Sequence, residues 1–221
     1  MDINSFLDFS LLHASTTERD VINLCNDALN NNYKSICVNS CYVPLAKQLL
    51  NATPVKICTT VGFPLGAVST EAKVFEAKKA IKDGADEIEM VINIGLLKSN
   101  NYMALLKDII DVKLAIGETP LKVIIEINEL SKNEVIKACE ICLDAKADYI
   151  KTTTGLTNKG TTFTALKIIK KTIRDNAKIA TSDDVLDTET ALKYIELGVD
   201  RIGVTSGIKS SKTKFINEEV F

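Results

Sequence analysis

The sequence predicts an α/β protein built as a single (β/α)8 barrel, the TIM-barrel architecture, over residues 1–221. Three observations lead to this prediction. Short apolar runs alternate with amphipathic helical stretches along the whole chain, there are eight such runs, and no linker, low-complexity tract or charge block divides them. Strict alternation of strand and helix selects the α/β class, and eight units favour a closed barrel. An open doubly wound sheet is the structural alternative.

The strand-like runs are rich in β-branched and apolar residues, and five are almost continuously hydrophobic. This is typical of parallel strands that helices cover on one side and packed side chains cover on the other. The runs span residues 6–10, 35–39, 55–61, 87–92, 121–127, 148–153, 177–182 and 200–205.

Helical stretches lie between these runs, and their ends carry recognisable signals. The stretch 16–31 begins with threonines that can cap a helix, and 69–84 runs from Ser69 to Gly84. The stretches 98–117 and 190–200 also end at or near a glycine, Gly117 and Gly198. Serine and threonine accept hydrogen bonds at helix starts, and glycine readily adopts the left-handed turn that ends a helix.

Composition excludes several functional classes. The net charge of −2 and the pI near 5.6 do not indicate nucleic-acid binding, which normally shows a basic surplus. No apolar run reaches the roughly 18 residues of a membrane span, and the acidic N-terminus does not resemble a signal peptide. We therefore expect a cytoplasmic enzyme, with no nucleic-acid or membrane partner, whose six cysteines stay free.

Cys139-x-x-Cys142 is the pair that most resembles a metal site. A zinc site needs about four ligands, there is no second such pair, and the sole histidine, His13, is distant in sequence. The two cysteines lie one helical turn apart on an apolar face, so we interpret them as core residues and predict no metal.

In barrels of this type the chemistry lies at the carboxyl ends of the strands. Lys151 occupies such an end, after Tyr149-Ile150 and before a run of threonines. A lysine amine attacks a carbonyl only when it is neutral, and burial or a second cation can lower its pKa from about 10.4. The alternative is a lysine that extends its ammonium to solvent at the rim.

Two glutamates share one face of the fourth run. Glu87 and Glu89 are two residues apart, so they point to the same side of a strand. Glu89, nearer the carboxyl end, is a candidate for moving protons. We interpret Glu87 as marking the solvated entrance of the strand.

A phosphate site is expected after the last strand. Thr205 and Ser206 are small and hydroxylated, and the loops after strands seven and eight often bind phosphate in barrels. Helix capping explains the same residues equally well. The segment from Gly155 to Thr162 is not a nucleotide loop, because Thr161 stands where a lysine must follow the second glycine.

The ordered set of these segments resembles the deoxyribose-phosphate aldolases of the short bacterial type over nearly the whole chain. The matching stretches are Cys37-Val38-Asn39, ICTTVGFPLGA at 57–67, residues 71–95, LKVIIEIN at 121–128, YIKTTTG at 149–155 and DRIGVTSG at 200–207. The resemblance implies a barrel without metal or organic cofactor. It also implies that Lys151 forms a Schiff base, that Asp8 belongs to the catalytic site and that Gly155 belongs to the substrate site.

Several positions depart from the pattern of that family. Glu89 stands where the family has an aspartate that relays a proton through water. Ala180 replaces a second lysine that lowers the pKa of the nucleophile, and Asp183-Asp184 replaces a glycine pair at the phosphate. Without that cation we expect Lys151 to hold its proton more tightly, and two carboxylates would repel a phosphate. Lys178, two residues before Ala180 on the same strand face, could replace the missing cation if its side chain reaches back.

Smaller departures concern the first strand and the chain end. Asp8 is retained, Ser10 replaces a threonine, and His13 replaces a lysine. The chain ends in Phe221, so it lacks the terminal tyrosine with which some family members move protons.

Three functions follow from these features. The first is cleavage of 2-deoxyribose 5-phosphate to glyceraldehyde 3-phosphate and acetaldehyde through Lys151 and Glu89. The second is Schiff-base chemistry on an unphosphorylated aldehyde or ketone, which Asp183-Asp184 would suit. The third is a non-catalytic paralogue that binds a metabolite or a protein. The sequence leaves a homodimer open.

Overall fold

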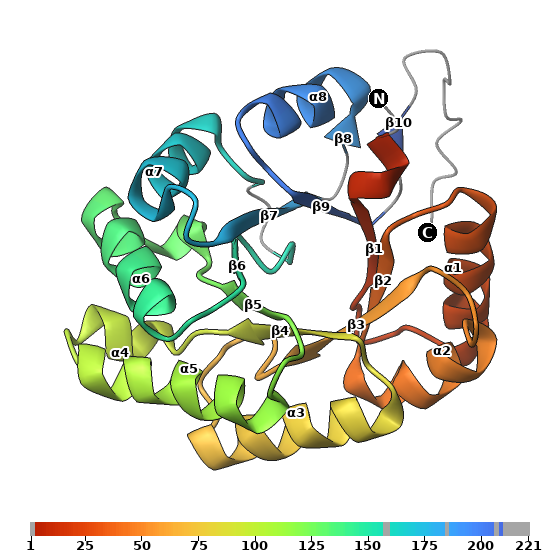
Figure 1. Cartoon of the computed structure of the whole chain (residues 1–221), viewed down its shortest axis with the longest axis horizontal. Helices are drawn as coiled ribbons and strands as arrows, with labels where there is room; N and C mark the ends of the chain where they lie inside the picture. Colours follow the sequence, from red (N-terminus) through yellow and green to blue (C-terminus); the bar gives the residue numbers. More distant parts are fainter. Residues whose placement is uncertain (1–2, 157–159, 184–185, 206–207, 210–221) are drawn as a thin grey trace.

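Eight parallel strands close into a barrel in the order β1-β2-β3-β4-β5-β6-β7-β9, and helices surround it (Figure 1). The computed structural model describes residues 3–156, 160–183, 186–205 and 208–209, without the side chains of residues 183, 186, 208 and 209. Closure of the sheet confirms the predicted (β/α)8 barrel and excludes the open sheet. A two-stranded sheet of β8 and β10 adds to the barrel among the described residues.

Each barrel strand lies within or close to one of the eight predicted runs. The barrel strands are β1 (Leu7–Leu11), β2 (Ser35–Val38), β3 (Lys56–Val61), β4 (Glu87–Val91), β5 (Leu121–Ile124), β6 (Tyr149–Lys151), β7 (Lys178–Asp183) and β9 (Arg201–Val204). The additional strands are β8 (Leu186–Asp187) and β10 (Ile208–Lys209).

The helices follow the strands along the chain. They are α1 (Glu18–Asn30), α2 (Val43–Leu49), α3 (Thr70–Asp83), α4 (Ile94–Lys98), α5 (Tyr102–Ile116), α6 (Lys132–Asp144), α7 (Phe163–Ile173) and α8 (Thr188–Glu196). Three short 3-10 helices accompany them: η1 (Ile3–Phe6), η2 (Ser40–Tyr42) and η3 (Ile127–Glu129).

The predicted helix ends have local causes that the structure confirms. Thr17 and Asp20 form a capping box at the start of α1. Ser69 accepts a hydrogen bond from the backbone of α3, and Gly84 ends that helix with a φ of 110°. The predicted 98–117 helix begins only at Tyr102, because the short α4 ends before it and Asn101 caps the new helix.

The strand register determines which side chains point into the barrel. Neighbouring residues in register include Glu89 with Lys122, Lys151 with Ala180, and Ser182 with Gly203. Registered residues share a face of the sheet, and side chains two residues apart along a strand share it too. Functional groups from strands far apart in sequence therefore meet inside the barrel.

Apolar side chains pack between the strands and the helices as the main core. Cys139 and Cys142 of α6 belong to this core and are fully buried, which confirms their interpretation as packing residues. Among the described residues, no helix combines the length and apolar character needed to cross a membrane.

Candidate active site

A cluster of six ionisable side chains fills part of the barrel interior. Each is more than nine-tenths buried, and their formal charges, three negative and three positive, cancel. Buried charges are stable only when they are paired and hydrogen-bonded, so the balance has a physical basis. The six residues are Asp8 of β1, Glu87 and Glu89 of β4, Lys122 of β5, Lys151 of β6 and Arg201 of β9.

Lys151 ends β6 with its ammonium inside the barrel. The side chain is not at a solvated rim, since the residue is only 1% exposed. Its Nζ donates a hydrogen bond to Glu89 Oε2 at 2.5 Å. Gly203 of β9 faces the same space: a methyl group there would lie 3.5 Å from Lys151 Nζ and 2.9 Å from the Thr181 carbonyl oxygen. The absence of a side chain at residue 203 leaves room around the amine.

Lys122 is the second ammonium of the cluster. Its Nζ lies 2.7 Å from Asp8 Oδ2, 2.8 Å from Glu87 Oε2 and 3.3 Å from Glu89 Oε1. Glu89 therefore holds one lysine with each carboxylate oxygen. This arrangement places two positive charges beside one carboxylate, and Lys122 is the cation next to the Lys151 site.

Asp8 and Glu87 share the guanidinium of Arg201. Arg201 Nε donates to Asp8 Oδ1 at 2.7 Å, and its two terminal nitrogens donate to Glu87 at 3.0 and 3.1 Å. Ser35 Oγ also donates to Asp8 Oδ1, at 2.6 Å. The interpretation of Glu87 as a solvated residue was wrong, because Arg201 and Lys122 compensate its charge inside the barrel.

The network fixes the charge states of its members. Burial alone would raise the pKa of Glu89 and of Asp8, but the neighbouring cations outweigh burial and hold both pKa values below their ordinary range. Burial lowers the pKa of Lys151, yet the carboxylate of Glu89 more than offsets this and raises the pKa above its usual value. Lys122 opposes that rise by charge repulsion. In the resting protein Lys151 is an ammonium ion.

Lys178 does not take the place of a second lysine. It faces the same side of β7 as Ala180, but its Nζ lies 5.4 Å from the centre of the Tyr149 ring and the residue is exposed. Lys122 lies over the same ring at 5.9 Å. Because Lys178 stays exposed beside the Tyr149 ring, it does not join the buried network, and the prediction that it could reach back was wrong.

The predicted phosphate-binding positions are partly described. Gly155 follows β6 with a φ of +79°, and a methyl group there would lie 2.7 Å from Ser182 Oγ, so this turn requires glycine. Thr205 directly follows β9 and is half-buried. Asp183 ends β7 and pairs in register with Val204. The side chain of Asp183, and the whole of Asp184, Ser206 and Phe221, lie outside the described residues.

Sequence reasoning found Lys151, Glu89 and Asp8 but missed Lys122 and Arg201. Both are charged residues inside otherwise apolar strands, which was a usable signal. Their partners are far away in sequence, since the Asp8–Arg201 contact joins residues 193 positions apart. The pattern of a single strand does not reveal such pairings.

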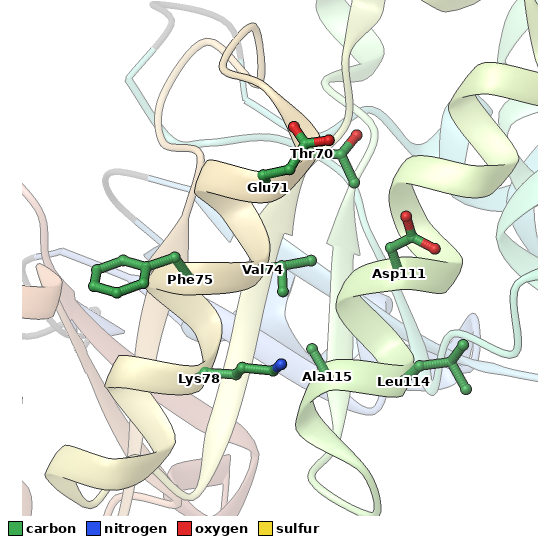
Figure 2. A pocket seen from close by; sticks show the side chains of 8 residues that line it. All are labelled: Thr70, Glu71, Val74, Phe75, Lys78, Asp111, Leu114 and Ala115. Atoms are coloured by element: carbon green, nitrogen blue, oxygen red, sulfur yellow. The ribbon is translucent and has the colours of Figure 1, made fainter.

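A hollow of about 530 Å³ lies elsewhere, on the outer helical layer between α3 and α5 (Figure 2). Phe75 and Leu114 border it and are 73% and 75% exposed. Charged side chains, among them Glu71 and Lys78 of α3, also line it. It contains none of the buried network, so it is a surface feature separate from the candidate active site.

Comparisons with known proteins agree with the fold and the site. The family model described as DeoC/LacD family aldolase matches residues 6–210. The deoxyribose-phosphate aldolase of Finegoldia magna is 47% identical over 95% of this chain and 98% of its own length. The solved structure of the aldolase QR15 has a TM-score of 0.89 at 35% identity and covers 93% of this chain and 92% of its own. A tetrameric deoxyribose phosphate aldolase from Aeropyrum pernix has a TM-score of 0.84 at 26% identity, with coverage of 92% and 87%.

The family match covers most of the chain, and the identity to the Finegoldia protein extends over nearly all of it. The chain belongs to the DeoC/LacD family of aldolases.

Proposed function

We propose that this chain cleaves 2-deoxy-D-ribose 5-phosphate to D-glyceraldehyde 3-phosphate and acetaldehyde, with Lys151 as the Schiff-base nucleophile. The observation that carries the proposal is a fully buried lysine at the carboxyl end of β6 in contact with a buried carboxylate. The activity named for the Finegoldia relative supports the choice of substrate. The chemistry requires an amine and proton transfer, and we propose no cofactor for it.

The neutral amine of Lys151 attacks the aldehyde carbon of the open-chain sugar, and loss of water gives a protonated imine. Removal of the proton from the C3 hydroxyl then breaks the C2–C3 bond. The electron pair of that bond passes towards the imine nitrogen, which leaves an enamine and releases glyceraldehyde 3-phosphate. Protonation of the enamine at C2 and hydrolysis of the imine release acetaldehyde and restore Lys151.

Glu89 is positioned to accept the first proton. Its Oε2 lies 2.5 Å from Lys151 Nζ, so the proton can pass directly rather than through a water molecule. Lys122 stands beside the same carboxylate and disfavours the charged form of Lys151. Asp8 acts by holding Lys122 in place.

The loops at the mouth of the barrel would bind the rest of the substrate. Thr205, Ser206 and the backbone at Gly155 are the groups we propose for the phosphate, as hydroxyls and backbone N–H groups suit an anion. Ser10 Oγ is buried and has no hydrogen-bond partner among the described residues, so it is available to a substrate hydroxyl. Asp183 ends the β7 segment and Asp184 follows it in the sequence, and we propose that their negative charge limits the affinity for phosphate.

The test is trapping of the imine. Borohydride reduction in the presence of 2-deoxyribose 5-phosphate should leave one adduct on Lys151, read by peptide mass spectrometry, and Lys151→Ala should lose turnover and adduct together. Lys178→Ala is the matched control and should keep both. Turnover retained in Lys151→Ala would refute the mechanism.

A parallel incubation with 2-deoxyribose and acetaldehyde separates the alternatives. An adduct from the unphosphorylated carbonyls alone would mean that Asp183-Asp184 has changed the substrate. No adduct from any of them would indicate a non-catalytic paralogue. The relatives do not favour either outcome.

We further propose that the enzyme acts in the cytoplasm as a homodimer. Its six free cysteines fit a reducing compartment. On α3, Phe75 is exposed between Glu71 and Lys78, which lie on either side of it along the helix (Figure 2). A two-fold axis near Phe75 with antiparallel α3 helices would pair each Glu71 with the partner's Lys78 and bury both phenyl rings.

A further inference from the structure

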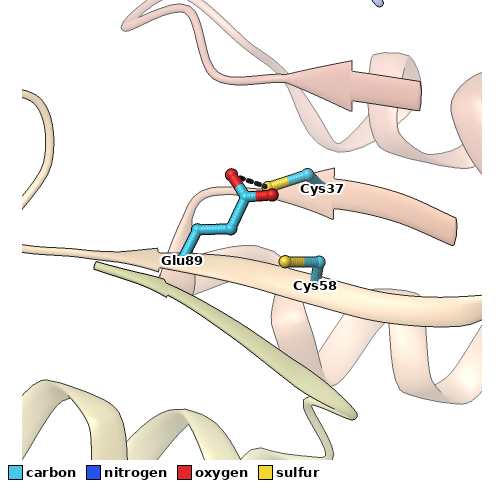
Figure 3. Close-up of side chains that lie close together, drawn as sticks. All are labelled: Cys37, Cys58 and Glu89. Atoms are coloured by element: carbon cyan, nitrogen blue, oxygen red, sulfur yellow. Dashed lines mark hydrogen bonds between the residues drawn. The ribbon is translucent and has the colours of Figure 1, made fainter. Parts of the chain in front are cut away.

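Two cysteine thiols and the Glu89 carboxylate converge inside the barrel (Figure 3). Cys37 of β2 and Cys58 of β3 are neighbours in register, so both point to the interior. The two sulfur atoms and a carboxylate oxygen lie within 4.8 Å of one another, and all three residues are buried. Cys37 Sγ lies 3.7 Å from Glu89 Oε2.

The distance between Cys37 Sγ and Glu89 Oε2 matches that between two ligands of one metal ion. With metal–sulfur bonds of about 2.3 Å and metal–oxygen bonds of about 2.0–2.2 Å, a tetrahedral angle separates sulfur from oxygen by about 3.5–3.7 Å. Two such sulfur ligands would be about 3.8 Å apart. The observed sulfur–oxygen distance of 3.7 Å fits without movement of the strands. We propose that Cys37, Cys58 and Glu89 form a binding site for a thiophilic divalent cation such as Zn²⁺ or Cd²⁺.

The electrostatics of the interior permit this binding. One divalent ion replaces the two thiol protons, which leave to solvent, so the formal charge of the interior does not change. The six-residue network is itself neutral. Lys122 contacts the other oxygen of Glu89, Oε1, whereas Lys151 contacts Oε2 and has to give up that contact to the ion. Burial raises the pKa of the Cys58 thiol well above its usual value and the Lys122 ammonium opposes that rise, so the ion itself has to displace the proton.

Ser10 is available to hydrogen-bond to the fourth ligand of the ion. Ser10 of β1 is in register with Cys37 and faces the same interior. Its hydroxyl is buried and has no partner among the described residues. A metal-bound water molecule could therefore complete the tetrahedron and hydrogen-bond to Ser10.

Occupation of the site would inhibit the enzyme. A metal ion on Glu89 takes up the Oε2 lone pair that otherwise receives the Lys151 proton. This consequence rests on the proposed function, whereas the binding itself does not. The site differs from the Cys139–Cys142 pair, which packs in the core on α6.

The experiment is a titration of the reduced, metal-free protein with Cd²⁺, followed by ultraviolet thiolate-to-cadmium charge transfer. We expect one ion per chain, two thiolates per ion and two protons released. Cys37→Ser and Cys58→Ser should each abolish the stoichiometric band, and the double variant of Cys139 and Cys142 to serine should retain it. A full band in the Cys37→Ser, Cys58→Ser double variant would overturn the proposal.

A second measurement uses the wild-type chain and so does not depend on the folding of variants. Alkylation followed over hours, so that local opening of the barrel exposes the buried thiols, and mapped by mass spectrometry should show that Cd²⁺ protects Cys37 and Cys58 and leaves the exposed Cys41 reactive. Equal protection of all cysteines, or none, would contradict the site. Zn²⁺ should also suppress turnover of 2-deoxyribose 5-phosphate, reversibly with a chelator. If Cd²⁺ protects both cysteines while turnover continues, the metal site stands and the role proposed for Glu89 is wrong.

Discussion

Replacement of Lys122 by methionine tests whether the buried network holds the barrel together. The substitution keeps the length of the side chain and removes the ammonium that lies 2.7–3.3 Å from Asp8, Glu87 and Glu89. It changes the formal charge of the network from zero to −1 in a place with no access to solvent.

The expected loss of stability is large. Removing one partner of a buried ion pair costs about 3–5 kcal/mol, because a charge is left uncompensated. Arg201 still forms ion pairs with Asp8 and Glu87, and Lys151 still forms one with Glu89, so we expect a loss in the lower part of that range. For a domain of this size each kcal/mol lowers the Tm by roughly 2–4 °C, which gives a fall of at least roughly 6 °C.

The pH dependence of this loss of stability shows whether an uncompensated buried charge causes it. In the wild type, the pKa values of Asp8 and Glu89 are lowered, so their contribution to stability is present above their ordinary values of about 3.9 and 4.3 and is lost as the pH falls. In Lys122→Met the missing positive charge raises the pKa of one of these carboxylates, and a proton bound there restores the neutrality of the network. The difference in the free energy of unfolding should therefore be greatest near pH 7 and shrink towards pH 5.

Urea denaturation at both pH values measures this difference. Lys107→Met is the control, because Lys107 pairs with Asp111 on the exposed face of α5 and its loss should not be detectable. A loss below about 1 kcal/mol at pH 7, or a loss that grows towards pH 5, would refute the reasoning.

Three other substitutions test separate parts of the structure. Glu89→Gln removes the carboxylate that raises the pKa of Lys151, so the yield of the borohydride-trapped adduct should begin to rise at a lower pH than in the wild type. Turnover should fall roughly 10²-fold or more. A pH profile of trapping that does not move would contradict the interaction between Glu89 and Lys151. Gly203→Ala places a methyl group 2.9 Å from a backbone oxygen and 3.5 Å from the Lys151 amine, and should cost about 1–3 kcal/mol in urea denaturation and slow trapping. Phe75→Lys should halve the mass measured by light scattering and leave activity per chain intact, whereas Leu192→Lys on α8 should change neither.

Much of the fold could be predicted because its signals are local. Thr17, Ser69 and Gly84 mark helix ends within a few residues of the chain, and the structure places helix ends beside all three. The eight apolar runs gave the strand number, and the number of βα units favoured closure. Closure brings Asp8 beside Gly203, at opposite ends of the chain.

The site was predictable only in part, because its contacts join residues that are distant in sequence. Lys151 and Glu89 could be found because the carboxyl ends of strands are the place to search. The burial of Glu87 could not, since it depends on Arg201 more than a hundred residues away. The reach of Lys178 also depends on a neighbour, the Tyr149 ring, whose position no strand pattern reveals.

The long side chain of Glu89 and the small side chain of Ala180 both shape the surroundings of the Lys151 amine. Glu89 comes from β4 and reaches across the register of Lys122 on β5 to meet Lys151 on β6. An aspartate would be shorter by one carbon–carbon bond, about 1.5 Å, so the 2.5 Å contact would open and a water molecule would have to carry the proton. On the other side of Lys151, its registered neighbour Ala180 brings no charge that would compete for the same carboxylate. Direct contact raises the pKa of Lys151, so under the proposed mechanism the amine becomes reactive once its proton moves to Glu89. We infer that this enzyme activates its nucleophile through a carboxylate acceptor within hydrogen-bond distance, with Lys122 on β5, and no residue of β7, as the neighbouring cation.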